Sequence, residues 1–192
     1  MMNWCSDPTN AENFSVFFNR DESKERSIAE PPAELVTESG TRFLMPTDLD
    51  AGGTWMFVNE RGGVVTLLNW YDKAVPYAEK ASRFRSRGLL VKELADVRDL
   101  GELENRLVEV KERAPYRPFH LLGFAPNSSP CGWSWDGKSV SKQQGWFIGK
   151  FNVLLHKRDW CRADEVYCVA SLKIKPCKRP KPTAICAGKT VT

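Results

Sequence analysis

Short apolar runs in the first part of the chain have the composition of β-strands. Residues 14–18 are aromatic and β-branched, and they predict a buried strand that ends at Asn19. Residues 54–59 and 64–70 are two further runs separated by Glu60-Arg61-Gly62-Gly63. This spacing predicts a β-hairpin with a glycine-containing turn.

The stretch between the first strand and this hairpin is mostly polar. Residues 23–41 contain Pro31, Pro32 and Gly40, and they predict a loop with little regular structure. Pro46-Thr47-Asp48 predicts a further turn.

Between residues 86 and 113 the spacing of apolar residues changes to three and four. This period predicts two amphipathic helices, interrupted near residues 99–101. Asp99 has the side chain of a helix N-cap, and Glu102 follows in the first turn of the second helix.

Strand patterns return after the helices. Residues 119–124 predict one strand, and residues 131–135 predict another that places Trp133 and Trp135 on one face. Asp136-Gly137 then predicts a tight hairpin turn. The order of strands, helices and strands favours a layered α+β domain over a βαβ repeat.

Beyond about residue 141 the periodicity weakens. Residues 146–155 are compatible with one more strand pair, and residues 166–174 with a further strand. Proline residues among the lysines near the C-terminus favour an extended tail.

Composition excludes wholesale disorder, because 42% of the residues are hydrophobic and 27% are charged. No apolar run approaches the ~18 residues that a membrane-spanning helix needs. The N-terminus lacks the basic and apolar regions of a signal peptide, so we expect a cytoplasmic protein with reduced thiols. The six cysteines include no Cys-x-x-Cys pair, and we therefore expect no metal site.

The net charge of +4 is unevenly distributed. Six basic residues and no acidic ones follow Leu172, which leaves −2 for residues 1–171. Such a tail either contacts phosphate groups or is simply solvated. We expect no specific nucleic acid partner, and binding to nucleic acid or to an anionic membrane surface through the tail stays an alternative.

Two blocks of sequence resemble a known family. Asn19-Arg20-Asp21-Glu22 after an aromatic strand resembles the signature that gives the NRDE family, the family of transport and Golgi organisation protein 2, its name. Residues 42–69 resemble the second block of that family, with Pro-x-Asp, Gly-Gly-Thr-Trp and a Leu-Asn strand end. Ser86-Arg87-Gly88 and Tyr116-Arg117-Pro118-Phe119 are similar to further family segments.

The resemblance covers residues 1–140, and we interpret this part as the family's core domain and residues 141–192 as a divergent region with a basic tail. It implies a fold similar to the N-terminal-nucleophile hydrolases, an αββα sandwich of two sheets between helical layers. Whether that sandwich is incomplete at its C-terminal end stays open.

The resemblance also implies functions proposed for the family: haem trafficking, lipid and acyl-coenzyme A metabolism, and Golgi organisation. The first hypothesis is therefore a protein that binds a small hydrophobic anionic ligand, with haem as transported cargo and no certain cofactor. The sequence indicates no oligomeric state.

The alternative hypothesis is a cysteine-dependent amidohydrolase or acyltransferase that uses an N-terminal nucleophile. In hydrolases of that fold the first residue attacks and its own α-amine serves as base. This chain begins Met1-Met2, and its first cysteine is Cys5. Either the true start lies upstream and exposes a cysteine, or the nucleophile is lost and Cys5 is an ordinary residue. The sequence as it stands leans towards a non-enzymatic protein, with Cys5 as the one catalytic candidate.

Ten residues of the family-like blocks are candidates for ligand binding. Arg20 has the fork geometry that binds carboxylate or phosphate, and Asn19 can donate to an oxyanion. The full set is Asn19, Arg20, Asp21, Glu22, Gly52, Gly53, Thr54, Trp55, Asn59 and Asn69.

Each candidate also has a structural interpretation. Arg20 can pair with Asp21 or Asp50, the glycine pair can form a bulge, and the asparagines can cap turns. Trp55, Trp133 and Trp135 are interpreted as core residues. His120 lies within an apolar strand and is interpreted as a core histidine with a hydrogen-bond partner.

Overall fold

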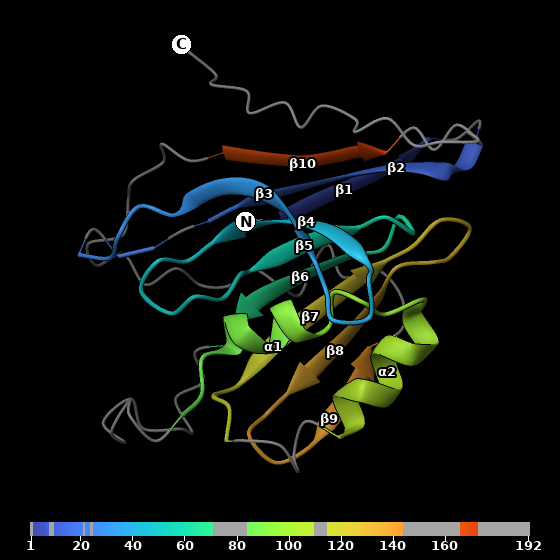
Figure 1. The fold of residues 1–192 in the computed structure, drawn as a ribbon. Helices are drawn as coiled ribbons and strands as arrows, with labels where there is room; N and C mark the ends of the chain where they lie inside the picture. The colour runs from blue at the N-terminus through green and yellow to red at the C-terminus, as the bar shows by residue number, and fades with distance from the viewer. Residues whose placement is uncertain are drawn as a thin grey trace. The chain divides into compact units, whose positions relative to one another are not determined.

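The computed structural model describes residues 2–7, 10–20, 22–23, 25–70, 84–109, 115–143 and 166–172 (Figure 1). The chain divides into two compact units. The first comprises Met1–Ser27, Pro126–Ser128 and Leu155–Thr192, and the second comprises Ile28–Ala125 and Ser129–Leu154. Each unit is considered by itself below.

The first unit contains a three-stranded antiparallel sheet with the order β1-β2-β10. The strands are β1 (Met2–Asp7), β2 (Asn10–Asn19) and β10 (Val166–Leu172). Phe14, Val16 and Phe18 are buried whereas Phe17 is 40% exposed, which is the alternation of a strand with one covered face. The predicted strand at residues 14–18 is confirmed, and the one predicted at residues 166–174 is confirmed as far as Leu172. β1 was not predicted.

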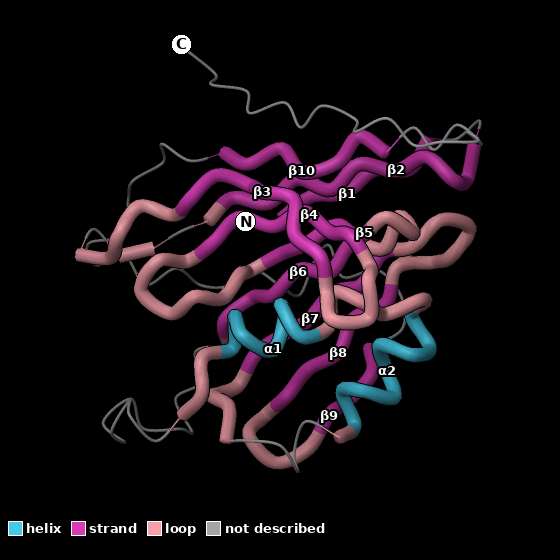
Figure 2. The backbone as a smooth tube through the Cα atoms, viewed as in Figure 1, coloured by secondary structure: helices cyan, strands magenta, loops and turns pink. Residues whose placement is uncertain are grey.

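The second unit contains a seven-stranded antiparallel sheet whose strands follow one another in chain order (Figure 2). Its strands are β3 (Glu30–Val36), β4 (Arg42–Thr47), β5 (Met56–Asn59), β6 (Val64–Asn69), β7 (Phe119–Phe124), β8 (Cys131–Trp135) and β9 (Val140–Gln143). Helices α1 (Arg87–Glu93) and α2 (Leu100–Val108) lie in the connection between β6 and β7. The predicted hairpin, helix pair and following strands are confirmed.

The core of this unit lies between one face of the sheet and the two helices. Leu90, Leu103 and Leu107 of the helices cluster with sheet residues such as Leu121 and Trp133, and all five are 2% exposed or less. Burying one such leucine stabilises the fold by about 1.5–3 kcal/mol, so this cluster holds the helices against the sheet. Trp135 belongs to the same cluster, which confirms that the tryptophans of β8 share a core-facing side.

The predicted loop at residues 23–41 is wrong for its second half, because β3 occupies Glu30–Val36. Among the described strands, β3 lies at the edge of its sheet and pairs with β4, and its register shifts between Glu30 and Ala33. Pro31 and Pro32 fall within that shift, where their missing N–H groups interrupt no ladder. The turn predicted at residues 46–48 begins later, because β4 continues through Thr47.

These observations confirm a mixed fold of helices and antiparallel strands. The expected αββα sandwich of the N-terminal-nucleophile hydrolases stays a prediction, as does the boundary at residue 140. Among the described residues, no helix has the length and apolar character to cross a bilayer. The strand pair predicted at residues 146–155, the end of the second predicted helical stretch at 110–113 and the tail at 173–192 lie outside the described residues.

Candidate ligand-binding site

The glycine pair before β5 lies against the beginning of α1. Gly52 has a φ of +66° and its N–H donates to Asp48 O at 2.7 Å, which closes a turn that favours glycine. A Cβ on Gly53 would lie 2.4 Å from Gly88 C, and Thr54 N donates to Gly88 O at 3.0 Å. The close approach that Gly53 permits is therefore to the chain's own backbone.

Thr54 and Trp55 connect the backbone contact between Gly53 and Gly88 to the sheet. Thr54 is 1% exposed, and its Oγ1 donates to Met56 O at 2.7 Å. Trp55 is 8% exposed, and its carbonyl accepts from Leu67 N at 2.8 Å. The interpretation of Trp55 as a buried residue is confirmed, and the family-like Gly-Gly-Thr-Trp block fixes where α1 begins.

Asn59 is buried at the turn of the β5–β6 hairpin. Its Nδ2 donates to Ala95 O at 3.2 Å and to Val97 O at 2.9 Å. Its Oδ1 accepts from the backbone N–H groups of Arg61 at 3.2 Å and Gly63 at 2.9 Å. These four bonds use the amide fully and tie the turn to the segment between the helices.

Asn69 lies at the opposite end of the same hairpin. Val58 pairs with Val64, whereas Asn69 pairs with Phe119 at the far end of β6. Six residues of strand between the turn and Asn69 correspond to roughly 20 Å. One small ligand would have to extend along the whole hairpin to contact both asparagines.

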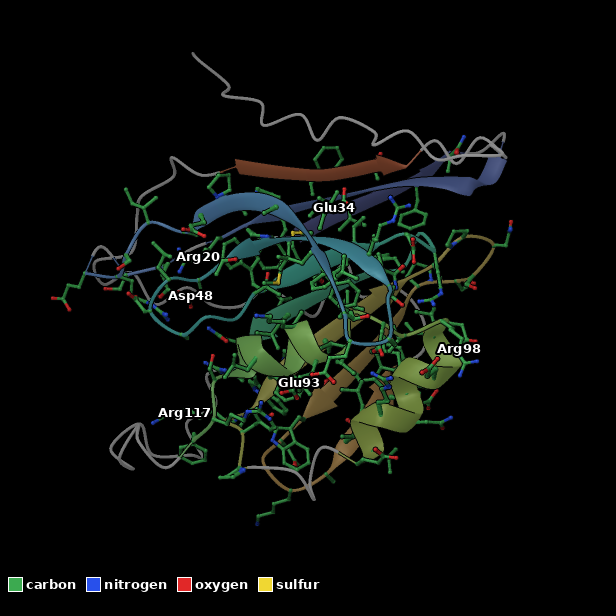
Figure 3. The ribbon with its side chains drawn as sticks, viewed as in Figure 1. Arg20, Glu34, Asp48, Glu93, Arg98 and Arg117 are labelled. Carbon is green, nitrogen blue, oxygen red and sulfur yellow. The ribbon has the colours of Figure 1, made fainter. Side chains whose placement is uncertain are left out.

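The carbonyl group of Pro118 connects the beginning of α1 with the chain that follows β6. Pro118 O accepts from Trp70 N at 3.2 Å and from Arg87 Nη1 at 2.8 Å. Arg117 Cζ lies 5.0 Å from the ring centroid of Phe84, within cation–π range. Figure 3 shows Arg117 beside the chain that leads into α1.

Trp70 and His120 form a stacked aromatic pair on the sheet face opposite that of Phe119 and Leu121, which pack against the helices. The rings of Trp70 and His120 lie 4.7 Å apart at an interplanar angle of 21°. His120 Nδ1 and Ser134 Oγ form a hydrogen bond of 2.8 Å, which confirms the predicted partner. The interpretation of His120 as a core residue is wrong, because its side chain is partly exposed and lies outside the buried core. Burial lowers the pKa of His120, and the ring is therefore mainly neutral near pH 7.

The segment before α1 runs beside the segment before β7. Arg85 N donates to Pro115 O at 3.0 Å, and Arg85 Nη1 donates to Tyr116 Oη at 3.1 Å. Burial acts to lower the pKa of Arg85, but its pairing with Glu93 outweighs this and raises it. Residues 84–88 and 115–120 together contain three arginines and no acidic residue.

We call Trp70, Arg87, Arg117 and His120 the α1 entry cluster. All four side chains are partly exposed, so solvent and solutes reach them. Guanidinium groups bind carboxylates and phosphates through paired donors, and aromatic rings hold apolar groups. Of these four side chains, residue patterns singled out His120 alone, and interpreted it as a core histidine. The available signal was the family-like segments at residues 86–88 and 116–119, which the fold brings together.

The polar tetrad at the end of β2 belongs to the other unit. Arg20 Nη2 lies 3.5 Å from Glu22 Oε2, and the Arg20 side chain is 8% exposed. Glu22 Oε2 also lies 3.5 Å from Arg26 Nη1. Glu22 is thus a partner of Arg20 that the sequence interpretation did not name. Asn19 ends β2 opposite Val166, and Asp21 lies outside the described residues.

Cys5 lies within β1 opposite Ser15, and only its backbone is described. Its catalytic role stays a prediction. In the described part of the chain, no group of three or more histidine, cysteine, aspartate or glutamate side chains is arranged to hold a metal ion.

A family model described as Transport and Golgi organisation 2 matches residues 1–159, which is most of the chain. The match includes the tetrad at residues 19–22, the glycine-led hairpin and all four residues of the α1 entry cluster. No curated protein matches the chain.

Proposed function

Because the chain belongs to the Transport and Golgi organisation 2 family, we propose that it binds a small hydrophobic anionic ligand at the α1 entry cluster. Haem is the ligand that the family resemblance suggests. Its flat ring and two carboxylates suit a site that combines aromatic and guanidinium groups. In this proposal haem is cargo and not a catalytic cofactor.

The observation that supports the proposal is the meeting of two family-like segments, because Arg87 Nη1 of residues 86–88 donates to Pro118 O of residues 116–119 at 2.8 Å. Arg87 is held by Pro118 O, the same carbonyl that fixes the backbone of Trp70. Arg117 directly precedes Pro118 in the chain. In this proposal the carboxylates of the ligand accept from Arg87 and Arg117, and each charged hydrogen bond is worth about 1.5–3 kcal/mol.

Haem titration followed by absorbance tests the proposal. We expect the Arg87→Gln, Arg117→Gln double variant to raise the Kd for haem at least about tenfold, since 1.4 kcal/mol corresponds to a factor of ten. Arg98→Gln is the matched control, because the Arg98 side chain is 75% exposed and pairs with Glu102 on α2. Its affinity should equal that of the parent protein.

Two outcomes contradict the proposal. One is the absence of a spectral change at micromolar parent protein. The other is a double variant that binds as tightly as the parent while its circular dichroism is unchanged. The ligand-binding roles of Asn19, Arg20 and Glu22 stay a separate prediction, which Arg20→Gln tests in the same titration.

A further inference from the structure

We propose that the outer edge of β3 binds an extended, lysine- or arginine-rich segment of a partner protein, which adds to the seven-stranded sheet as an antiparallel strand. This inference concerns an interaction surface and does not depend on the proposed function. It rests on the direction of the backbone groups of β3, on the exposure of its side chains and on the charge of the segment that contains it.

Every second residue of β3 directs its backbone N–H and C=O groups away from β4. Arg42 O accepts from Glu60 N at 2.9 Å, so the backbone groups of Arg42 face β5 and not β3. Val36 is the β3 partner of Arg42, and it therefore belongs to a non-hydrogen-bonded pair whose own groups point outward. The register is continuous from Ala33 to Val36, so the backbone groups of Glu34 point outward as well.

This edge is open in the described part of the chain. No described strand lies beyond β3 (Figure 1), and the outward groups of Glu34 and Val36 have no described hydrogen-bond partner. Val36 is 62% exposed, and the Glu34 side chain is 51% exposed. Each residue offers one donor and one acceptor, so two residues of an added strand could form four backbone hydrogen bonds here.

The open edge is short and has defined ends. Pro31 and Pro32 have no N–H groups, so an added strand cannot pair continuously beyond Ala33. At the other end β3 leads into a turn, in which Gly40 N donates to Thr37 O at 2.9 Å. The edge therefore accepts a strand of about five residues, in which main-chain bonds give affinity and alternate side chains give specificity.

The charge of the segment selects the partner. Residues 28–41 contain no lysine or arginine, and they contain three exposed glutamates, Glu30, Glu34 and Glu38. Arg42 Nη1 lies 3.9 Å from Glu34 Oε1, but Arg42 Nε lies 3.0 Å from Glu60 Oε2, so this one cation is shared with a further acid. A basic residue directly opposite Glu34 would form a cross-strand ion pair, which stabilises an antiparallel ladder.

The same charge argues against a second copy of this chain as the partner. Two β3 strands that pair antiparallel around Leu35 place Glu34 of each copy opposite Val36 of the other. The two Glu34 residues are then diagonal neighbours about 7–8 Å apart, which is within the screening length of about 8 Å at physiological salt. Their repulsion disfavours self-pairing, whereas a basic strand gains from the same carboxylates.

A nuclear magnetic resonance titration of the isotope-labelled full chain tests the proposal. The probe is an acetylated and amidated peptide of sequence Thr-Lys-Thr-Val-Thr-Lys-Thr, whose valine can lie opposite Val36 while its second lysine lies opposite Glu34. We expect the largest amide shifts at Glu34 and Val36. A peptide with glutamate in place of both lysines should bind at least about tenfold more weakly, and added salt should reduce the difference.

Two variants separate backbone pairing from charge. Val36→Pro removes an outward N–H and breaks no bond to β4, and we expect it to raise the Kd for the lysine peptide at least about tenfold. Val36→Thr keeps the N–H and is the matched control, which should bind as the parent protein does. Glu34→Lys requires no backbone change and should narrow the difference between the two peptides to about threefold or less. Unchanged amide resonances of β5 to β8 show that each variant is folded.

Three results overturn the proposal. The first is a titration that shifts no amide at Glu34 or Val36. The second is equal binding of the lysine and glutamate peptides, or a folded Val36→Pro variant that binds as tightly as Val36→Thr. The third is a dimer of the parent protein without peptide that Val36→Pro converts to a monomer in sedimentation equilibrium, because this edge would then belong to a second copy. None of these results bears on the haem titration.

Discussion

Replacing Asn59 by alanine should destabilise the protein strongly although Asn59 lies far from the α1 entry cluster along the hairpin. The residue is 2% exposed, and its amide makes four hydrogen bonds to backbone groups. Asn59→Ala removes all four together. The hairpin turn then loses its connection to the segment between α1 and α2.

The magnitude follows from where the four partners lie. Ala95 and Val97 are 0% and 4% exposed, so their carbonyl groups lose a donor inside the protein. Arg61 is exposed and Gly63 is partly exposed, so water can reach their N–H groups. Two buried carbonyl groups without a partner at about 1–1.5 kcal/mol each, plus two weaker losses, give about 3 kcal/mol. That corresponds to a fall in Tm of about 6–12 °C for a chain of this length.

Urea denaturation followed by circular dichroism measures the change as a shift in midpoint at constant slope. Asn105→Ala is the matched control, because Asn105 is exposed on α2 and alanine favours the helix. We expect the control to change the free energy of unfolding by no more than about 0.5 kcal/mol.

Asn59→Asp adds a test with a defined pH dependence. Its carboxylate would face the carbonyl oxygens of Ala95 and Val97, which raises its folded-state pKa above the unfolded value of about 3.9. The folded state then holds the proton more tightly, so the variant regains stability as pH falls from 7 towards 4. A loss below about 1 kcal/mol in Asn59→Ala, or a deficit in Asn59→Asp that does not shrink on acidification, would refute this account of Asn59.

Three smaller perturbations test other local features. Gly53→Ala should lower the free energy of unfolding by about 2–3 kcal/mol, because its Cβ would overlap the Gly88 backbone. Gly52→Ala should lower it by about 1–2 kcal/mol, because of the positive φ alone. Urea midpoints of the two variants show which is the more destabilised. Asp99→Ala removes the cap of α2 and should cost about 1 kcal/mol in the same assay, and no change would contradict the cap. Backbone N–H groups of its own turn lower the pKa of Asp136, so its contribution is present above about pH 4 and is lost as pH falls through the folded pKa. Thermal midpoints measured against pH should therefore fall less steeply on acidification in Asp136→Asn, and parallel curves would contradict this.

Local patterns predicted the elements whose partners are near in sequence. Two apolar runs and a glycine-containing turn were enough to predict the hairpin around residues 60–63. The period of the apolar residues and the cap at Asp99 were enough to predict the second helix. The Asp99 side chain accepts from Glu102 N at 2.8 Å. In such cases the hydrogen bonds close within a few residues, so the sequence itself contains both partners.

Strand β3 shows where local patterns mislead. Pro31 and Pro32 exclude a central strand, but they do not exclude an edge strand whose register shifts around them. Whether a strand lies at an edge is a property of the whole sheet. The pairing of β2 with β10, which joins residues about 150 positions apart in sequence, is not visible in local periodicity for the same reason.

The sequence by itself determined the family-like blocks, the alternation of apolar residues and the chemistry available in each segment. Only the tertiary structure placed residues 86–88 beside residues 116–119 and stacked Trp70 on His120. The stack depends on the β6–β7 register, and a shift of one residue would turn His120 to the other face of the sheet. Long-range packing of the whole unit selects that register, so the candidate site follows from the fold and not from any one segment.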